Sequence, residues 1–260
     1  MTLLLAFIFG TMVGSFLNVC VYRIPEGQSI VLPASHCRTC KKPIAMYDNI
    51  PLVSFLLLKG KCRHCGAALS IQYPLVELVT GLLAAACLLK WGAGYAAAIW
   101  FVFCAALIVI TFIDLAHKII PDVISLPGIA GGLLLSLLPG QPGLPSALIG
   151  AALGGGSLLL IRLVYYALTR QEGMGLGDVK LLAMMGAFLG WKSILFIIMV
   201  ASFTGALLGA AVMVIKKKNG RYAIPFGPFL SLGALCYLFC GPEMINWYLN
   251  LHWLIQEGIG

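Results

Sequence analysis

Long apolar runs make up most of the chain, and short polar segments separate them. The runs cover residues 1–22, 73–89, 91–113, 123–161, 193–215 and 222–241. A membrane-spanning helix needs about 20 mostly apolar residues, so each run predicts at least one span. Because outer-membrane barrels show short alternating segments instead, we expect an all-α polytopic membrane protein.

The run at 123–161 is long enough for two spans, and a stretch rich in proline and glycine at 139–145 divides it. We expect the second of these spans to continue to about residue 168. A further apolar segment at 180–191 is short for a full span, which predicts a tilted or half-buried helix. The total is about eight transmembrane helices.

The polar segments complete the domain organisation. Residues 23–72 contain prolines and seven Lys or Arg residues, which predicts a small extramembrane domain after the first span. Residues 73–241 then form the transmembrane core. The tail at 242–260 contains Trp247 and Trp253, and aromatic side chains of this kind favour an interfacial helix.

The composition supports a membrane protein. Hydrophobic residues make up 61% of the 260 residues and charged residues 10%, whereas soluble domains carry about 25% charged residues. The net charge of +8 would suit nucleic-acid binding, but positive charge beside membrane spans sets their orientation. We therefore expect the lipid bilayer as a partner and no nucleic acid.

The distribution of positive charge predicts the orientation. If the 23–72 domain is cytoplasmic, alternating spans leave only Lys90 and Lys192 of the 17 Lys and Arg residues outside, with Arg162 within a span. Basic residues concentrate on the cytoplasmic side of membrane proteins, so we expect this domain inside and both termini outside. A re-entrant short segment would instead place the basic cluster at 216–221 outside.

Four cysteines in the extramembrane domain form two pairs, Cys37-x2-Cys40 and Cys62-x2-Cys65, with 21 residues between them. Thiolates at this spacing can wrap one zinc ion tetrahedrally. We expect a closed, structural, zinc-ribbon-like site, because so small a domain has little core of its own. Free thiols or disulfides are the alternatives, and a cytoplasmic location disfavours disulfides.

Two aspartates lie at predicted ends of membrane helices. Asp114 ends the third span and Asp178 opens the short segment at 180–191, and the topology places both at the cytoplasmic boundary. Ionisable groups near hydrocarbon are costly and are candidates for function. Because two close carboxylates cannot easily both ionise, one can act as general base and the other as acid, as in aspartic proteases.

Other interpretations of these two acids remain open. Asp stabilises a helix N-terminus, so ordinary helix-end charges would explain Asp178. A transporter that couples ion movement to transport would also need intramembrane acids. Gly175 and Gly177 would allow close backbone approach and an irregular helix start before Asp178.

Four further polar residues are weaker candidates for supporting or binding roles. Lys180 could steady a carboxylate or extend to the membrane surface, and Asp122 follows Asp114 in the same polar stretch. Glu77, near the start of the second span, could contact a substrate amine or a cofactor, or could be an interfacial helix-start acid. Asn18 in the first span is expected to face the helix bundle and to hydrogen-bond a neighbour.

Four ordered motifs resemble those of the bacterial type IV prepilin leader peptidases, also called leader peptidase/N-methyltransferases. They are Gly14-Ser-Phe-Leu-Asn-Val-Cys-Val-Tyr-Arg-Ile-Pro25, the segment from Asn49-Ile-Pro51 to Tyr73-Pro-Leu-Val-Glu77, the segment from Asp114 to Ile120-Pro-Asp122, and Gly175-Leu-Gly-Asp-Val-Lys180. The first cysteine pair departs from the family's frequent Cys-Pro-x-Cys because it contains Arg38, and the ligand spacing is unchanged.

The resemblance implies a Gly-x-Gly-Asp membrane aspartic peptidase of the bacterial cytoplasmic membrane, with Asp114 and Asp178 as the catalytic pair and Asp122 secondary. It implies prepilins or pseudopilins as substrates, cut after a glycine, and for many members N-methylation of the new N-terminus with S-adenosylmethionine. A peptidase without methylation, an ion-coupled transporter and a zinc-stabilised assembly scaffold are the alternatives. The chain has no Rossmann glycine fingerprint, so a site for S-adenosylmethionine is expected elsewhere, such as between the cysteine domain and the membrane surface.

Overall fold

The structure is a computed structural model, and it describes residues 1–171, 173–216 and 225–257. These residues form helices and loops, with two isolated β-bridges and no strand. The all-α fold predicted from the apolar runs is therefore confirmed. The chain divides into two compact units, Met1–His117 and Lys118–Gly260.

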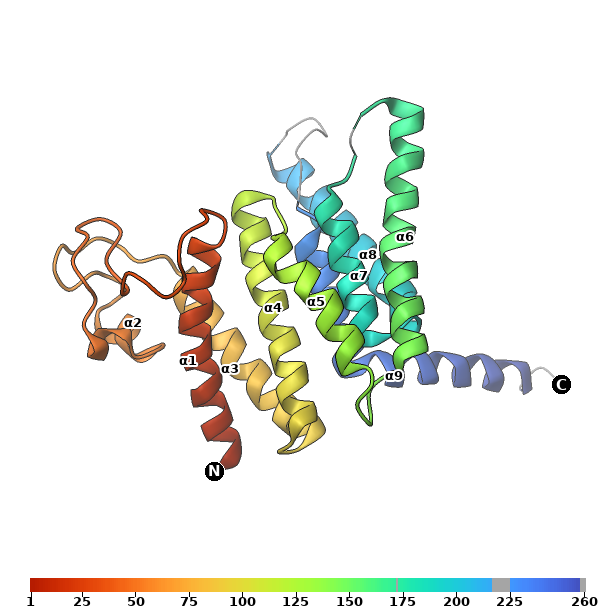
Figure 1. Cartoon of the computed structure of the whole chain (residues 1–260), viewed down its shortest axis with the longest axis horizontal. Helices are drawn as coiled ribbons and strands as arrows, with labels where there is room; N and C mark the ends of the chain where they lie inside the picture. The colour runs from red at the N-terminus through yellow and green to blue at the C-terminus, as the bar shows by residue number, and fades with distance from the viewer. Residues whose placement is uncertain (172, 217–224, 258–260) are drawn as a thin grey trace. The chain divides into compact units, whose positions relative to one another are not determined.

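The first unit contains three long helices and the polar domain (Figure 1). The long helices are α1 (Thr2–Arg23), α3 (Gln72–Trp91) and α4 (Tyr95–His117), and they pack against one another. The polar domain connects α1 to α3. It is mostly loop and includes the 3-10 helix η1 (Met46–Asn49) and the short helix α2 (Val53–Leu57).

The second unit contains five helices within the described residues. They are α5 (Asp122–Leu135), α6 (Leu144–Thr169), α7 (Leu176–Leu189), α8 (Lys192–Lys216) and α9 (Gly227–Glu257). α7 packs against the other four. It is buried along most of its length, including Leu181, Met185 and Ala187. A helix with apolar residues on all faces suits this central position in the unit.

Six of these helices are long and apolar enough to cross a membrane. They are α1, α3, α4, α6, α8 and α9. α5 and α7 have 14 residues each, which is about 21 Å at 1.5 Å per residue and less than a hydrocarbon core of about 30 Å. The described residues thus contain a helix for each of the eight expected spans, but only six of these helices are long enough to span, so the count of about eight is approximate; α7 is short as expected. The shortness of α5 was not expected from its apolar run.

Glycines bring helix backbones close together within each unit. In the first unit, a Cβ atom on Gly14 of α1 would lie 2.7 Å from the Cα atom of Glu77 in α3. In the second unit, a Cβ atom on Gly150 of α6 or Gly186 of α7 would overlap backbone atoms of the other helix. Small residues permit this approach between membrane helices, and it fixes where α3 and α7 present their polar residues.

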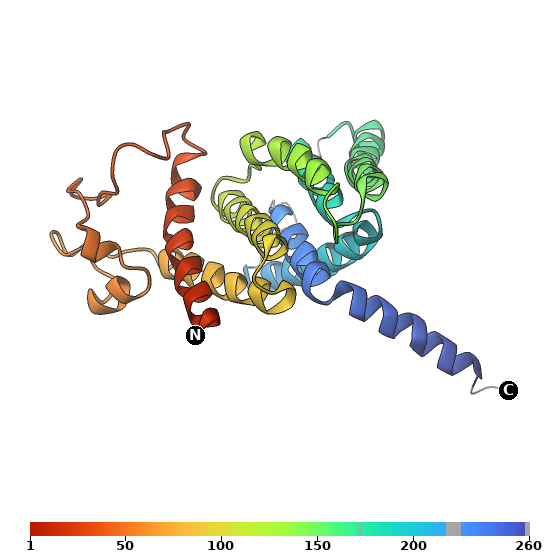
Figure 2. The same ribbon diagram turned by 60° about the horizontal axis from the view of Figure 1, so that its bottom comes forward.

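The last helix does not end where the tail was expected to begin. α9 continues to Glu257 with Pro242 inside it, so the tail from residue 242 belongs to the same helix. Figures 1 and 2 both show its last turns leading away from the other helices of the unit. An interfacial location for these turns stays a prediction. Three residues of the predicted basic cluster lie outside the described residues, namely Lys217, Lys218 and Arg221.

Candidate functional site

The four predicted metal ligands lie together. The sulfur atoms of Cys37, Cys40, Cys62 and Cys65 are all within 4.8 Å of one another, and those of Cys37 and Cys65 are 3.8 Å apart. Tetrahedral zinc with Zn–S bonds of about 2.3 Å places its sulfurs about 3.8 Å apart. The donor set therefore fits a structural zinc ion, and no His, Asp or Glu of the described residues joins the cluster.

The two cysteine pairs lie in matching turns. The Cys37 N–H donates to the Lys42 carbonyl at 2.9 Å, and the Cys62 N–H donates to the Ala67 carbonyl at 2.8 Å. An isolated β-bridge closes each turn in the same register. The same local backbone fold therefore presents both pairs of thiols, which explains how a small domain with few buried side chains gathers four ligands.

Backbone N–H donors and neighbouring thiols give the thiols of Cys37 and Cys65 different pKa values. The Cys40 N–H is the main group that lowers the pKa of the Cys37 thiol to about 6. The Ala67 N–H alone would lower the pKa of Cys65, but burial and the thiols of Cys62 and Cys37 raise it to about 11. Thiols must lose their protons to bind a metal ion, and the backbone N–H groups of the first turn favour the thiolate of Cys37.

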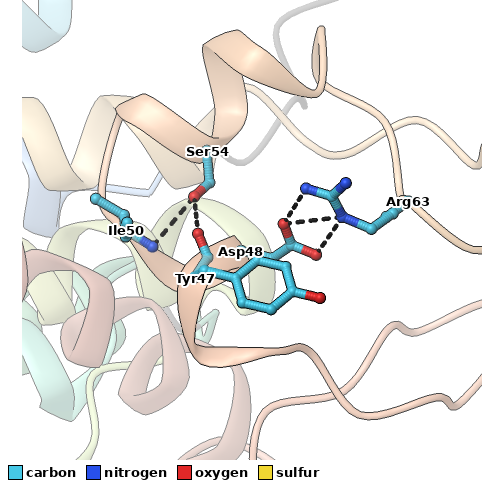
Figure 3. A network of polar contacts seen from close by, with 5 residues as sticks. All are labelled: Tyr47, Asp48, Ile50, Ser54 and Arg63. Atoms are coloured by element: carbon cyan, nitrogen blue, oxygen red, sulfur yellow. Dashed lines mark hydrogen bonds and ion pairs between the residues drawn. The ribbon is translucent and has the colours of Figure 1, made fainter.

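An ion pair and a serine hold the loop between the cysteine pairs, as Figure 3 shows. Asp48 accepts hydrogen bonds from Arg63, at 2.6 Å from Nη2 and 2.8 Å from Nε, and this pairing lowers the pKa of the Asp48 carboxyl. Ser54 Oγ donates to the Tyr47 carbonyl at 3.0 Å and accepts the Ile50 N–H at 3.2 Å. These contacts tie η1 both to α2 and to the second cysteine pair.

Two arginines connect the cysteine domain to the end of α1. Arg23 is 5% exposed and donates to the carbonyls of Ser29 at 2.9 Å and Pro33 at 2.7 Å. Arg38, inside the first cysteine pair, lies over the Tyr22 ring with its guanidinium carbon 3.9 Å from the ring centroid. Both contacts restrict how the domain is placed against the helix.

A cleft of about 400 Å³ lies between the cysteine domain and the adjoining ends of α1 and α3. It is lined by Cys37 and Cys62 of the cluster, Tyr73 and Glu77 of α3, and Asn18 of α1. Pockets for small ligands have volumes of about 300–1,000 Å³. A cavity of suitable size is thus present in the region where the sequence suggested a cofactor site.

Glu77 is a buried acid on the wall of this cleft. It is 8% exposed, and its Oε2 accepts the Leu52 N–H at 2.8 Å. Leu52 has φ 61° and ψ −48°, which is a strained conformation for a residue with a side chain. Glu77 therefore holds the turn before α2. Contact between Glu77 and a substrate amine or cofactor stays a prediction.

Asn18 lies beside Glu77 on the lining of the cleft. Its Nδ2 donates to the Tyr73 carbonyl of α3 at 3.1 Å and to the Gly14 carbonyl at 3.3 Å. The expectation that Asn18 hydrogen-bonds a neighbouring helix is therefore confirmed. Its Oδ1 is buried and has no hydrogen-bond partner among the described residues.

Asp114 lies near the end of α4, in the interior of the first unit. The residue is 4% exposed, and Ile110 and Ile113 on the same helix are fully buried. A carboxyl group is rarely placed in such surroundings without a functional reason. The placement agrees with a catalytic role for Asp114 and does not by itself identify its partner.

Asp178 lies in the first turn of α7, three residues after the N-cap residue Gly175. A Cβ atom on Gly175 would lie 3.6 Å from Asp178 Oδ2, whereas one on Gly177 would lie 2.8 Å from the Cβ atom of Ile120. Close approach therefore requires glycine at Gly177 and not at Gly175. Asp178 belongs to the second unit and Asp114 to the first, so their pairing stays a prediction.

Lys180 links the beginnings of two helices in the second unit. Its Nζ lies 2.7 and 2.8 Å from the two carboxylate oxygens of Asp122. Asp122 is the first residue of α5, and Lys180 follows Asp178 in α7. Of the two roles considered for Lys180, contact with a carboxylate is observed, and the carboxylate belongs to Asp122.

Two family models match the chain. The Bacterial Peptidase A24 N-terminal domain matches residues 8–91, and the Type IV leader peptidase family matches residues 101–210. A curated relative from Aeromonas salmonicida, named prepilin leader peptidase/N-methyltransferase, is 37% identical over 95% of this chain and 93% of its own length. The chain belongs to the type IV leader peptidase family. The resemblance of its four motifs is thereby confirmed.

Other relatives of this family member carry the same name. The protein from Pseudomonas aeruginosa is 35% identical over 94% of this chain and 92% of its own length. The protein from Myxococcus xanthus is 42% identical over 82% of this chain and 64% of its own length. No solved structure matches the chain. The family and the six apolar helices together show an integral membrane protein.

Sequence reasoning about this leader peptidase family member missed two of its contacts. Lys180 and Asp122 are 58 residues apart, and Glu77 is 25 residues from Leu52. In both cases the partners lie in segments that had been singled out for the family resemblance. Membership of these family motifs was the only hint in the sequence that the residues lie near one another. A motif does not say which residues are in contact.

Proposed function

We propose that this chain removes the leader from prepilins or pseudopilins and then methylates the new N-terminus with S-adenosylmethionine. Membership of the type IV leader peptidase family carries this proposal, and the names of the curated relatives supply both reactions. We place both reactions at the cytoplasmic face of the bacterial inner membrane. Positive charge around the cysteine domain supports that orientation.

For leader cleavage we assign Asp114 and Asp178 as the catalytic pair. The ionised carboxylate takes a proton from a water molecule while the water oxygen attacks the carbonyl carbon of the leader's last glycine. The protonated carboxyl group donates to the carbonyl oxygen. Collapse of the tetrahedral intermediate breaks the C–N bond: the leaving amine takes the proton that the first carboxylate accepted from water, and a hydroxyl of the intermediate returns a proton to the second carboxylate. The burial of Asp114 near the end of α4 supports its assignment to the pair.

Lys180 and Asp122 act in this proposal as positioning residues for Asp178. Residues two positions apart on a helix point about 200° apart around its axis, so Lys180 extends from the face of α7 opposite Asp178. Its ion pair with Asp122 at the start of α5 restrains rotation of the first turn of α7. A restrained turn holds the Asp178 carboxylate in one direction, which favours a reaction that depends on alignment.

For methylation we assign the cleft beside the cysteine cluster. Its volume suits a nucleotide-sized cofactor, and its lining contains a buried acid and a buried acceptor without a partner. S-adenosylmethionine would supply an electrophilic methyl group there, held by groups such as Glu77, Tyr73 and Asn18. Zinc bound to the four cysteines would keep the wall of the cleft in place.

The test of the peptidase assignment is cleavage of a prepilin by the full-length protein in detergent. We compare the wild type with Asp114→Asn and Asp178→Asn, which preserve side-chain shape and remove the charge. Each variant should lose cleavage by at least about 10³-fold while it keeps its zinc content and elution volume. Asp48→Asn is the matched control and should cleave normally. Substantial cleavage by either catalytic variant would contradict the two-aspartate mechanism.

A peptidase without methylation is the second candidate, and mass spectrometry separates the two. A product heavier by one methyl group in the presence of S-adenosylmethionine supports the bifunctional protein. An unmodified product under the same conditions supports cleavage alone.

A further inference from the structure

Asn18 leaves an unsatisfied acceptor on the lining of the cleft. The residue is 5% exposed, it lines the cleft, and its Oδ1 has no hydrogen-bond partner among the described residues. Nearly all buried polar atoms in proteins are hydrogen-bonded, because an unpaired one costs free energy. An unpaired buried oxygen beside a cavity therefore points to a donor that arrives with a ligand.

The orientation of the Asn18 amide is fixed by its neighbours. Its Nδ2 donates to two carbonyl oxygens, those of Tyr73 and Gly14. If the amide were flipped, an oxygen would face both carbonyls and neither contact would be a hydrogen bond. The oxygen must therefore be the atom without a partner, and the group that it lacks is an N–H or O–H donor.

The ligands of the proposed methyl transfer narrow the class of donor. The charge of the cleft does not, because two acids, Asp48 and Glu77, line it together with five basic side chains, Arg23, Arg38, Lys42, Lys61 and Arg63. A primary amine is the donor that both ligands of that reaction carry, and it offers N–H groups to the oxygen.

We propose that Asn18 Oδ1 accepts a hydrogen bond from a primary amine bound in this cleft. The inference rests on the proposed methyl transfer, in which two ligands carry such a group. One is the amino group of S-adenosylmethionine, and the other is the new N-terminus of the cleaved pilin. Asn18 is thus a binding residue for methylation and has no part in leader cleavage.

Two variants of nearly the same shape isolate the oxygen. Asn18→Leu and Asn18→Asp both remove the Nδ2 donors to Tyr73 and Gly14, but only Asn18→Asp keeps an acceptor at this position. Each full-length protein is tested in detergent for methylation of a peptide that begins at the mature pilin N-terminus. The kcat/KM of Asn18→Leu should fall about tenfold or more, and that of Asn18→Asp should fall clearly less, because it keeps the acceptor although its second oxygen then faces the carbonyls of Tyr73 and Gly14. Leader cleavage should be equal in all three proteins.

Binding of S-adenosylhomocysteine, which carries the same amino group as the methyl donor, separates the two sources. If its Kd rises about tenfold in Asn18→Leu alone, the amine is that of the cofactor. If its Kd is unchanged and the KM for the peptide rises, the amine is that of the peptide. Either outcome upholds the inference.

Two outcomes would overturn it. Normal methylation by Asn18→Leu would show that water satisfies the oxygen. Equal losses in Asn18→Leu and Asn18→Asp would show that the Nδ2 donors matter and the acceptor does not. Absence of methylation by the wild type is a different result, because it contradicts the proposed methyltransferase function itself and removes the basis of the inference with it.

Discussion

The cysteine domain and the aspartate-bearing helices hold their polar groups by different means. In the cysteine domain, matching turns, an ion pair and backbone hydrogen bonds gather the metal ligands, and the cleft beside them lies within one unit. Asp114 and Asp178 instead lie on mostly apolar helices, and each belongs to a different unit. The first arrangement depends on local polar contacts around a cysteine cluster that fits a metal ion, and the second depends on helix packing. Substitutions should therefore separate the two proposed reactions.

Removal of the metal ligands should give the largest difference between the two proposed reactions. Replacing Cys62 and Cys65 together by Ser should eliminate bound zinc, because two of the four thiolate ligands are lost. Methylation should fall about 100-fold or more, since the cleft wall that contains Cys62 loses its support, while leader cleavage should change by less than about threefold. Zinc content by mass spectrometry and both activities are measured on the same sample.

Replacement of the membrane cysteines Cys236 and Cys240 by Ser is the matched control, and it should leave zinc bound. Equal loss of cleavage and methylation in the Cys62 and Cys65 variant would show that the domain supports both reactions alike.

A smaller effect is expected at Glu77. Glu77→Gln keeps an oxygen that can accept the Leu52 N–H, so the strained turn should persist, but it removes one of the two acids, Glu77 and Asp48, that line the cleft. Methylation should fall about 10- to 100-fold through loss of a charged contact with an amine, with cleavage unchanged. Glu77→Leu removes both the charge and the contact with Leu52.

Comparison of the two Glu77 variants separates charge from support of the turn. If Glu77→Gln methylates normally and Glu77→Leu does not, Glu77 only holds the turn.

A still smaller effect is expected at the Lys180–Asp122 ion pair. Lys180→Met should lower the kcat of leader cleavage about three- to tenfold with little change in KM, because the first turn of α7 is less restrained and the bound substrate is less often aligned. The exchanged variant, Lys180→Asp with Asp122→Lys, should recover much of the activity. Initial rates over a range of prepilin concentrations give both constants.

A different role for Lys180 would produce a different pattern. If its charge acted on Asp178 rather than on the position of α7, the exchanged variant would stay impaired and the pH profile of cleavage would shift.

Most of the fold followed from the sequence because membrane helices are encoded by local composition. The apolar runs located the helices, and the paired cysteine spacing located the cluster. The remaining features depend on tertiary contacts. The Lys180–Asp122 ion pair joins residues 58 positions apart, and the unsatisfied oxygen of Asn18 follows from where α3 places the Tyr73 carbonyl. The short length of α5 was missed because the run at 123–161 was treated as two full spans, although the break at 139–145 leaves few residues for the first of them.

The smallest expected effect is a pH-dependent change in the thermal stability of the cysteine domain. The Arg63 contact lowers the pKa of Asp48, so the stability that it provides is fully present above the ordinary Asp pKa of about 4 and is lost as the pH falls through the lowered value. Asp48→Asn should slightly lower the thermal unfolding midpoint, by an amount that is constant from pH 7 to about pH 5 and shrinks below about pH 4. A difference that grows on acidification would contradict the assigned ion pair.

The most direct test of the account is to follow both reactions in the same samples by mass spectrometry. Wild type, Asp178→Asn and Glu77→Gln are each given an intact prepilin and, separately, a peptide that begins at the mature pilin N-terminus, with S-adenosylmethionine present. The account predicts that Asp178→Asn methylates the mature peptide but does not cleave the prepilin, and that Glu77→Gln cleaves the prepilin but methylates poorly. Loss of both reactions in either variant would contradict two separable sites.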